Sequence, residues 1–206
     1  MANTNRKINR MVRLGVLTAI IFLLAFTPLG YLVIGPIAAT TIQMPVIIGA
    51  VLMGPAAGAI LGGFFGLSAI IKVLTMPGAD VFATAVLTYT PLGYLVICLV
   101  PRILMGWLSG LLGKVLNKAP ILQGKKSVIG YGIAGLVGSL LNTVLYLGAL
   151  WGIAAQVIAN SYGVDLSGVG AIVIATATGA GIPEAIVSCL VVAAVCRAMK
   201  ALDKTL

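Results

Sequence analysis

The chain has 206 residues, of which 61% are hydrophobic and only 8% charged, and its mean hydropathy is +1.18. A chain of this composition must be shielded from water along nearly its whole length, which excludes an ordinary soluble domain. The formal net charge of +9 does not indicate nucleic-acid binding, because the basic residues lie at the ends of apolar spans. Histidine is absent and only four residues are acidic, so we expect neither a metal centre nor a bound cofactor.

Apolar runs recur along the chain and are broken by proline, glycine or charge, without the alternation of barrel strands. We therefore predict an all-α fold, a multi-pass transmembrane bundle of six helices in one integral membrane domain, residues 1–206. The start of the first span resembles a signal-peptide core, but the number of later spans favours an uncleaved helix. After a basic leader, residues 1–13, the expected spans are about 14–33, 42–54, 55–74, 94–116, 128–150 and 182–200.

The basic residues indicate the orientation of the bundle. Eleven of the 13 lysines and arginines lie in the leader, in the connector 114–126 or in the C-terminal tail. Six spans place these three regions on one side of the membrane, and the positive-inside rule assigns that side to the cytoplasm. We therefore expect both termini in the cytoplasm and a multi-pass protein of the cell membrane.

Residues 43–72 form the central feature of the sequence, two apolar spans joined by a turn at Met53-Gly54-Pro55-Ala56. Gly58, Gly62 and Gly66 recur at every fourth position of the second span. Glycines one helical turn apart leave a groove that lets a neighbouring helix approach closely in lipid. We therefore predict a membrane helix hairpin packed against another helix.

The octapeptide TPLGYLVI occurs twice, at residues 27–34 and 90–97, but the flanking sequences do not match. It therefore does not indicate a duplicated fold. We expect Tyr31 and Tyr94 at the membrane interface, where amphipathic rings settle. Residues 75–90 and 154–168 are predicted as loops.

Lys72 and Arg102 are the two cations outside the basic clusters, and both map toward the outer half of the bundle. Asp80, Asp165 and Glu184 also map outside. Charges within membrane segments are costly unless they serve a purpose, so an outer cavity is the expected ligand site. For Lys72, the alternative is that it snorkels to the headgroups.

The other polar residues also leave two interpretations open. Arg102 either clasps a ligand carboxylate or pairs with Glu184. Asn142 and Tyr146, one helical turn apart, either line the cavity or form a structural hydrogen bond between helices. Glu184 beside Pro183 also fits a simple acidic residue at a helix N-terminus.

Four separated motifs resemble the substrate-binding S component of energy-coupling factor (ECF) vitamin transporters, and within that family the pantothenate-type branch. The first motif contains Thr41 and Gln43, which join the five residues above as expected ligand contacts. Gln43 stands where the family pattern leads us to expect histidine, which changes the hydrogen bonding and leaves the exact vitamin open. The motifs are ATTIQMPVIIGAVLMGPAAGAILGGFFGL, PRILMGWLSGLLGKVL, LLNTVLYLG and IPEAI.

The resemblance implies a membrane protein, not an enzyme, that captures a vitamin from outside and topples in the bilayer to deliver it inward. Its implied partners are a transmembrane coupling subunit and two cytoplasmic ATPases, and the chain itself has no GxxxxGK[ST] loop. Small residues on the first helix dock the coupling subunit in this family, and Gly15 and Ala19 are the matching positions. The alternative is that this pair packs inside the bundle.

The alternative functions are of three kinds. One is an S component for another vitamin, of the riboflavin, folate, pyridoxine or cobalamin type. A self-sufficient proton-coupled carrier would need acidic or histidine side chains deep in the bundle, and only Glu184 is a candidate. A membrane enzyme would need a nucleophile with a base, or a metal cluster, and the sequence has no such constellation.

Overall fold

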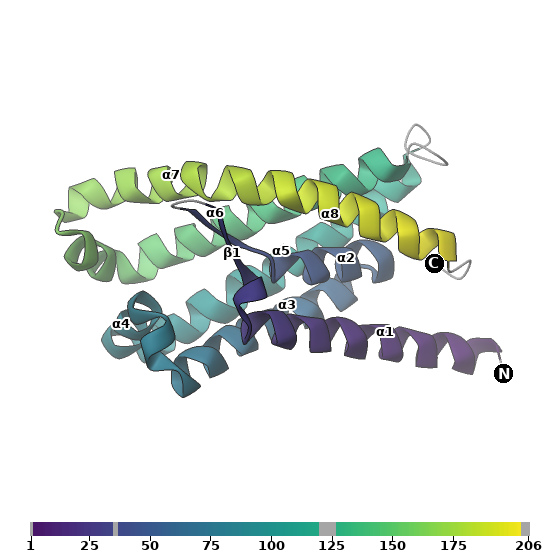
Figure 1. Ribbon diagram of the computed structural model, residues 1–206, viewed down its shortest axis with the longest axis horizontal. Helices are drawn as coiled ribbons and strands as arrows, with labels where there is room; N and C mark the ends of the chain where they lie inside the picture. Colours follow the sequence, from purple (N-terminus) through teal and green to yellow (C-terminus); the bar gives the residue numbers. More distant parts are fainter. Residues whose placement is uncertain (1, 35–36, 120–126, 203–206) are drawn as a thin grey trace.

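The computed structural model describes residues 2–34, 37–119 and 127–202, and this part of the chain is almost entirely helical (Figure 1). Two short strands, β1 (Tyr31–Ile34) and β2 (Ile37–Thr40), pair as an antiparallel hairpin between the first two helices. The 3-10 turns are η1 (Pro28–Gly30), η2 (Pro77–Ala79) and η5 (Leu166–Gly168). The α-helices are α1 (Ala2–Ala25), α2 (Gln43–Met53), α3 (Pro55–Thr75), α4 (Val81–Tyr89), α5 (Pro91–Lys118), α6 (Ser127–Tyr162), α7 (Val169–Gly179) and α8 (Gly181–Leu202).

Among the described residues, five helical stretches are long and apolar enough to cross a membrane. The 11 residues of α2 extend only about 16 Å, which is shorter than a bilayer core. Nine of them are buried, so α2 is enclosed by the other helices and does not face lipid along its length. The protein is therefore a helical, multi-pass membrane bundle. Its five long stretches are Lys7–Ala25, Pro55–Thr75, Pro91–Lys118, Ser127–Tyr162 and Leu166–Leu202.

The predicted hairpin of apolar helices is present as α2 and α3. Gly54 joins them with a φ of +90°, a conformation that favours glycine, and Pro55 opens α3. The glycines of α3 face the backbone of α5: a Cβ atom at Gly58 or Gly62 would meet the carbonyl of Gly106 or Arg102. The groove predicted from the sequence therefore receives α5, and this close contact brings the functional residues of the two helices together.

The first helix ends earlier than predicted. The sequence favoured a span over residues 14–33, but α1 ends at Ala25 and the chain continues through η1 into β1. Pro28 has no backbone N–H, and its ring disfavours a helical conformation at the preceding residue. Gly30 N–H instead closes a turn on the carbonyl of Thr27, at 3.2 Å.

The prediction of a loop over residues 75–90 is wrong, because this segment contains η2 and α4. Asp80 caps α4, and its carboxylate accepts a hydrogen bond from Ala83 N–H at 2.9 Å. No proline or glycine interrupts the nine residues that follow Asp80. A short capped helix therefore forms where composition alone favoured a loop.

The predicted loop over residues 154–168 is also largely wrong. Ala154 has non-helical dihedral angles (φ −126°, ψ 28°), but it bends α6 without ending it, and the helix continues to Tyr162. The polar residues of this extension lie on the exposed side, where Gln156 Nε2 donates to Asn160 Oδ1 at 3.2 Å. Gly163, with a φ of +65°, follows the last helical residue.

The two ends of the chain lie at the same end of the bundle, whereas α4 and the turn from α6 to α7 lie at the opposite end (Figure 1). The helices α7 and α8 follow one another along α6. Residues 120–126, most of the predicted basic connector, lie outside the described residues.

Candidate functional site

A cavity of about 160 Å³ lies between α3, α4, α5 and α6, and we call it the polar chamber. It brings together four residues that the sequence predicted as ligand contacts: Lys72, Arg102, Asn142 and Tyr146. Four more of its residues are hydrophobic, namely Phe65, Ala69, Val73 and Ala83. The remaining lining residues are Thr40, Asp80, Tyr94 and Cys98.

Arg102 is held by the backbone that precedes it. Its Nη1 donates to the carbonyl oxygens of Cys98, at 2.8 Å, and of Ile97, at 3.3 Å. Pro101 has no N–H to offer the Ile97 carbonyl, so the arginine satisfies an acceptor that the helix cannot. Its buried Nε has no hydrogen-bond partner among the described residues. Arg102 therefore has a structural role within α5 and also lines the polar chamber.

Two aromatic rings flank the guanidinium group. Its central carbon lies 4.6 Å from the ring centre of Phe65 and 4.9 Å from that of Tyr146. Cation–π contacts of this kind fix the plane of an arginine and strengthen when water is excluded. Asn142, one helical turn before Tyr146, lines the same chamber. The chamber therefore combines two cations, one carboxylate, an aromatic wall and a neutral amide.

Tyr94 is a residue whose place the sequence analysis missed. It was expected at the membrane interface, but it is only 4% exposed and lines the polar chamber. The sequence does indicate this position, because Tyr94, Cys98 and Arg102 recur at every fourth position and therefore share one face of α5.

Asp80, predicted as an outer carboxylate, also lines the polar chamber, and it caps α4.

Gln43 and Glu184 lie outside the lining of the chamber, in a second polar group that also contains Ser139. We call these three residues the Glu184 cluster. Gln43 Nε2 donates to Ser139 Oγ at 2.9 Å and to Glu184 Oε2 at 3.3 Å. Glu184 is 7% exposed, and its Oε1 accepts the backbone N–H of Thr40 at 2.7 Å. Within the described chain, its hydrogen bonds go to these partners and not to Arg102.

Thr40 connects the two polar groups. Its backbone N–H binds Glu184, and the residue itself lines the polar chamber at the end of β2. Thr41, the next predicted contact, is turned elsewhere: its hydroxyl donates to the carbonyl of Leu29 at 2.7 Å. The Glu184 cluster and Thr41 therefore fix the end of the β-hairpin beside the chamber, and they do not line it.

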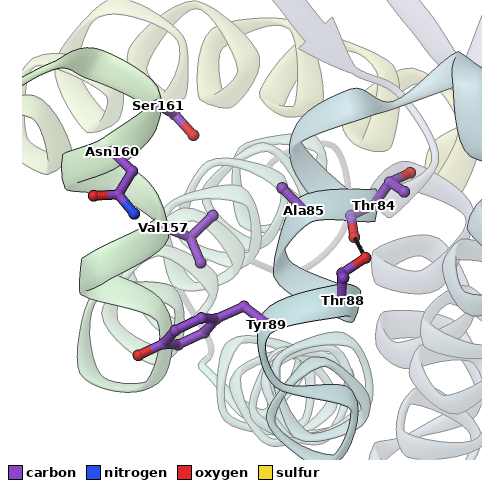
Figure 2. Close-up of a pocket in the computed structure, with 7 residues that line it drawn as sticks. All are labelled: Thr84, Ala85, Thr88, Tyr89, Val157, Asn160 and Ser161. Atoms are coloured by element: carbon purple, nitrogen blue, oxygen red, sulfur yellow. Dashed lines mark hydrogen bonds between the residues drawn. The ribbon is translucent and has the colours of Figure 1, made fainter.

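A larger, open groove of about 640 Å³ lies between α4 and the extension of α6 (Figure 2). The Tyr89 ring reaches from α4 toward α6 in this view. Its threonines are already hydrogen-bonded within their own segment, since Thr88 donates to the Thr84 carbonyl at 2.9 Å and Thr84 to that of Asp80 at 2.8 Å. The lining includes no charged side chain. The smaller polar chamber is therefore the better candidate for an ionic ligand.

The predicted docking residues lie on the outer face of α1. Gly15 and Ala19 are both exposed, and a Cβ atom built at Gly15 meets nothing within 4 Å. Leu17 and Ile21, on the opposite face, are buried against the bundle. In this chain, the small residues therefore face outward, which argues against their packing inside the bundle.

Comparison with known proteins agrees with this architecture. A family model described as "ECF transporter, substrate-specific component" matches residues 9–196. The chain is 32% identical over 123 residues to the pantothenic acid transporter PanT of Lactococcus lactis subsp. cremoris, which covers 56% of this chain and 58% of that protein. It is also 32% identical over 124 residues to the pantothenate transporter PanT of Leuconostoc mesenteroides subsp. mesenteroides, covering 59% and 54%.

These matches span little more than half the length of the two curated relatives. The family model, in contrast, covers nearly the whole chain and includes every residue of the polar chamber and of the Glu184 cluster. The resemblance inferred from the four sequence motifs is thereby confirmed. The protein belongs to the family of substrate-specific components of ECF transporters.

Proposed function

We propose that this chain binds an anionic vitamin, pantothenate, in the polar chamber and presents it for ATP-driven uptake by a separate ECF module. The observation that carries the proposal is the pair of cations, Lys72 and Arg102, which line one cavity with Asn142 and outnumber its single carboxylate, Asp80. A carboxylate is a natural partner for such a site, because arginine forms strong, charge-assisted hydrogen bonds with it. The names of the two relatives agree with this choice.

The size of the chamber also favours a small ligand. Its volume of about 160 Å³ is well below the roughly 300–1,000 Å³ of pockets that hold drug-sized molecules. Riboflavin, folate and cobalamin are larger than pantothenate, and pyridoxine, which is small, has no carboxylate. Among these vitamins, pantothenate therefore combines a small size with the carboxylate that the two cations favour.

We propose six membrane crossings with both termini in the cytoplasm. The five long helical stretches would be completed by α2 together with the β-hairpin. The common position of the two chain ends supports this orientation, as do the basic residues near them (Figure 1). The polar chamber would then open toward the outside, near α4.

This orientation is tested by labelling with a membrane-impermeant thiol reagent. The thiol from Asn117→Cys should react only from the cytoplasmic side, and the thiol from Ser161→Cys only from outside. The native cysteines in the unmodified protein provide the background for comparison. The reverse pattern would overturn the proposed orientation.

The exposed strip formed by Gly15 and Ala19 supports the proposal that α1 docks the coupling subunit, which in turn carries two ATPases. Small residues allow a partner helix to approach closely. Gly15→Trp or Ala19→Trp should therefore abolish uptake and co-purification with the module while pantothenate affinity changes less than twofold. Leu17→Trp, on the buried face, should instead lower stability and disturb ligand binding. Full uptake with tryptophan at both exposed positions would exclude this docking surface.

The ligand itself is tested by competition. The purified protein is incubated with an equimolar mixture of pantothenate, riboflavin, folate, pyridoxine and cobalamin, and the retained vitamin is identified by native mass spectrometry. We expect retention of pantothenate alone. Retention of another vitamin would contradict the proposed ligand but not the family.

A further inference from the structure

A second cavity, of about 190 Å³, adjoins the polar chamber and has a different character. It lies between α4, α6 and α7, and we call it the apolar annex. None of its described lining residues is charged, whereas three charged residues line the chamber. Its hydrophobic lining residues are Phe82, Leu147, Leu150, Ile158, Ile172 and Val173.

Tyr146 is the only described residue that lines both cavities. On the chamber side, its ring lies 4.9 Å from the guanidinium carbon of Arg102. Leu147 and Leu150, which follow it on α6, belong to the annex. The helix α4 also borders both spaces, with Phe82 at the annex and Ala83 at the chamber. The two cavities are therefore neighbours that share Tyr146 in their linings.

The backbone of α6 shapes the annex. The non-helical residue Ala154 bends this helix, and the residues that line the annex lie on both sides of the bend. Ala154 is itself fully buried, so the bend is enclosed by neighbouring helices. Because the bend belongs to the main chain, we expect the annex to persist when an adjacent side chain is shortened.

We propose that Tyr146 is a specificity-determining residue that limits the length of the ligand. Its ring, held against Arg102, closes the polar chamber toward the annex. Acids whose uncharged part fits within the chamber are accepted, and acids with a longer aliphatic part are rejected. This inference rests on the proposed function, since it assumes that the chamber binds an acid.

The consequence is measurable with probes of increasing length. N-butanoyl-, N-hexanoyl- and N-octanoyl-β-alanine share the carboxylate and amide of pantothenate and differ in their aliphatic part. In the purified full-length protein, the octanoyl probe should bind at least tenfold more weakly than the butanoyl probe. In Tyr146→Ala, the order should reverse, because each methylene that enters the annex strengthens binding by up to about fourfold.

Further variants locate the effect. Tyr146→Phe keeps the ring and should keep the length limit. Adding Val173→Phe to Tyr146→Ala fills the annex and should restore the limit. Val173→Phe alone should leave pantothenate affinity unchanged, because Val173 lies outside the chamber. Tyr146→Leu provides a second test if Tyr146→Ala does not fold, with a smaller shift in the same direction.

A folded Tyr146→Ala or Tyr146→Leu variant with the wild-type length profile would overturn the inference. It would also be overturned if the gain survived Val173→Phe, since the aliphatic chain would then lie elsewhere. If the wild-type protein bound neither pantothenate nor any of the probes, the proposed function would fail and this inference with it. If the wild-type protein binds pantothenate and the Tyr146 variants keep its length limit, only the proposed role of Tyr146 is overturned.

Discussion

The polar chamber and the Glu184 cluster both place polar side chains inside the bundle, but the chamber residues surround a cavity, whereas the cluster residues form hydrogen bonds with one another. In the cluster, both carboxylate oxygens of Glu184 accept hydrogen bonds, from Thr40 and from Gln43. In the chamber, Arg102 and Lys72 border about 160 Å³ of space together with Asn142. Polarity within a membrane bundle therefore does not by itself indicate a ligand site; the space between the polar groups distinguishes the two cases.

The difference follows from how the helices approach one another. The glycines of α3 bring its backbone against α5, and the side chains beyond this contact border the chamber. The Glu184 cluster instead joins α2, α6 and α8 through hydrogen bonds between side chains. We therefore expect changes in the chamber to alter ligand affinity, and changes in the cluster to alter mainly stability.

The largest effect is expected at Arg102. Arg102→Ala removes a charged donor from the chamber and leaves the Ile97 carbonyl without its partner. The loss of a charge-assisted hydrogen bond costs about 1.5–3 kcal/mol, so pantothenate should bind roughly tenfold to hundredfold more weakly in a calorimetric titration. Arg102→Lys, which keeps the charge but not the planar fork, should lie between. Affinities within twofold of wild type for both variants would remove the chamber as the ligand site.

A change in the Glu184 cluster should act in a different way. Glu184→Ala leaves the Thr40 N–H without its acceptor and should lower the free energy of unfolding by about 1 kcal/mol, a typical value for hydrogen bonds between membrane helices. Denaturant unfolding measures this change. Glu184→Gln keeps an acceptor for Thr40 and should cost less. Pantothenate affinity should fall less than in Arg102→Ala; an equal fall with unchanged stability would place Glu184 at the ligand instead.

The smallest effect is expected at the neutral amide of the chamber. Asn142→Ala should weaken pantothenate binding by roughly twofold to tenfold, which corresponds to one uncharged hydrogen bond. Asn160→Ala is the matched control, because the same side chain lies at the open groove on the same helix. We expect no change in affinity for this control. Equal losses in both variants would show that the groove, and not only the chamber, affects binding.

The helices with the strongest patterns were predictable from the sequence. Gly54, Pro55 and the glycines of α3 correctly predicted the turn and the close contact of two helices. The helical extension of α6 was missed because its polar residues resemble those of a loop. They remain in a helix since they lie on its exposed side and no proline interrupts them.

The repeated octapeptide shows how far local sequence can determine structure. Residues 27–34 form η1 and β1, whereas the identical residues 90–97 lead from the cap Thr90 into α5. In the second copy, Thr90 Oγ1 accepts the N–H of Gly93 and Pro91 opens the helix. In the first copy, the Thr27 hydroxyl instead donates to the carbonyl of Leu23 in the preceding helix. The neighbouring segments therefore decide the structure of these eight residues.

The chamber was predictable only in part. Lys72 and Arg102 could be found because a lone charge in an apolar span is costly, and Asn142 and Tyr146 followed from helical spacing. The partners of Glu184 could not, since Gln43 and Thr40 lie 141 and 144 residues away in the chain. Only the packing of α2 and the β-hairpin against α8 brings them together.

The central claim, that pantothenate occupies the polar chamber, is tested most directly by protection of an introduced thiol. Ala69→Cys places a thiol at the chamber and Thr88→Cys places one at the open groove, and peptide mass spectrometry separates both from the native cysteines. We predict that saturating pantothenate slows modification at residue 69 by at least tenfold and leaves residue 88 unaffected. An unchanged rate at residue 69, in a protein that binds pantothenate, would contradict the claim.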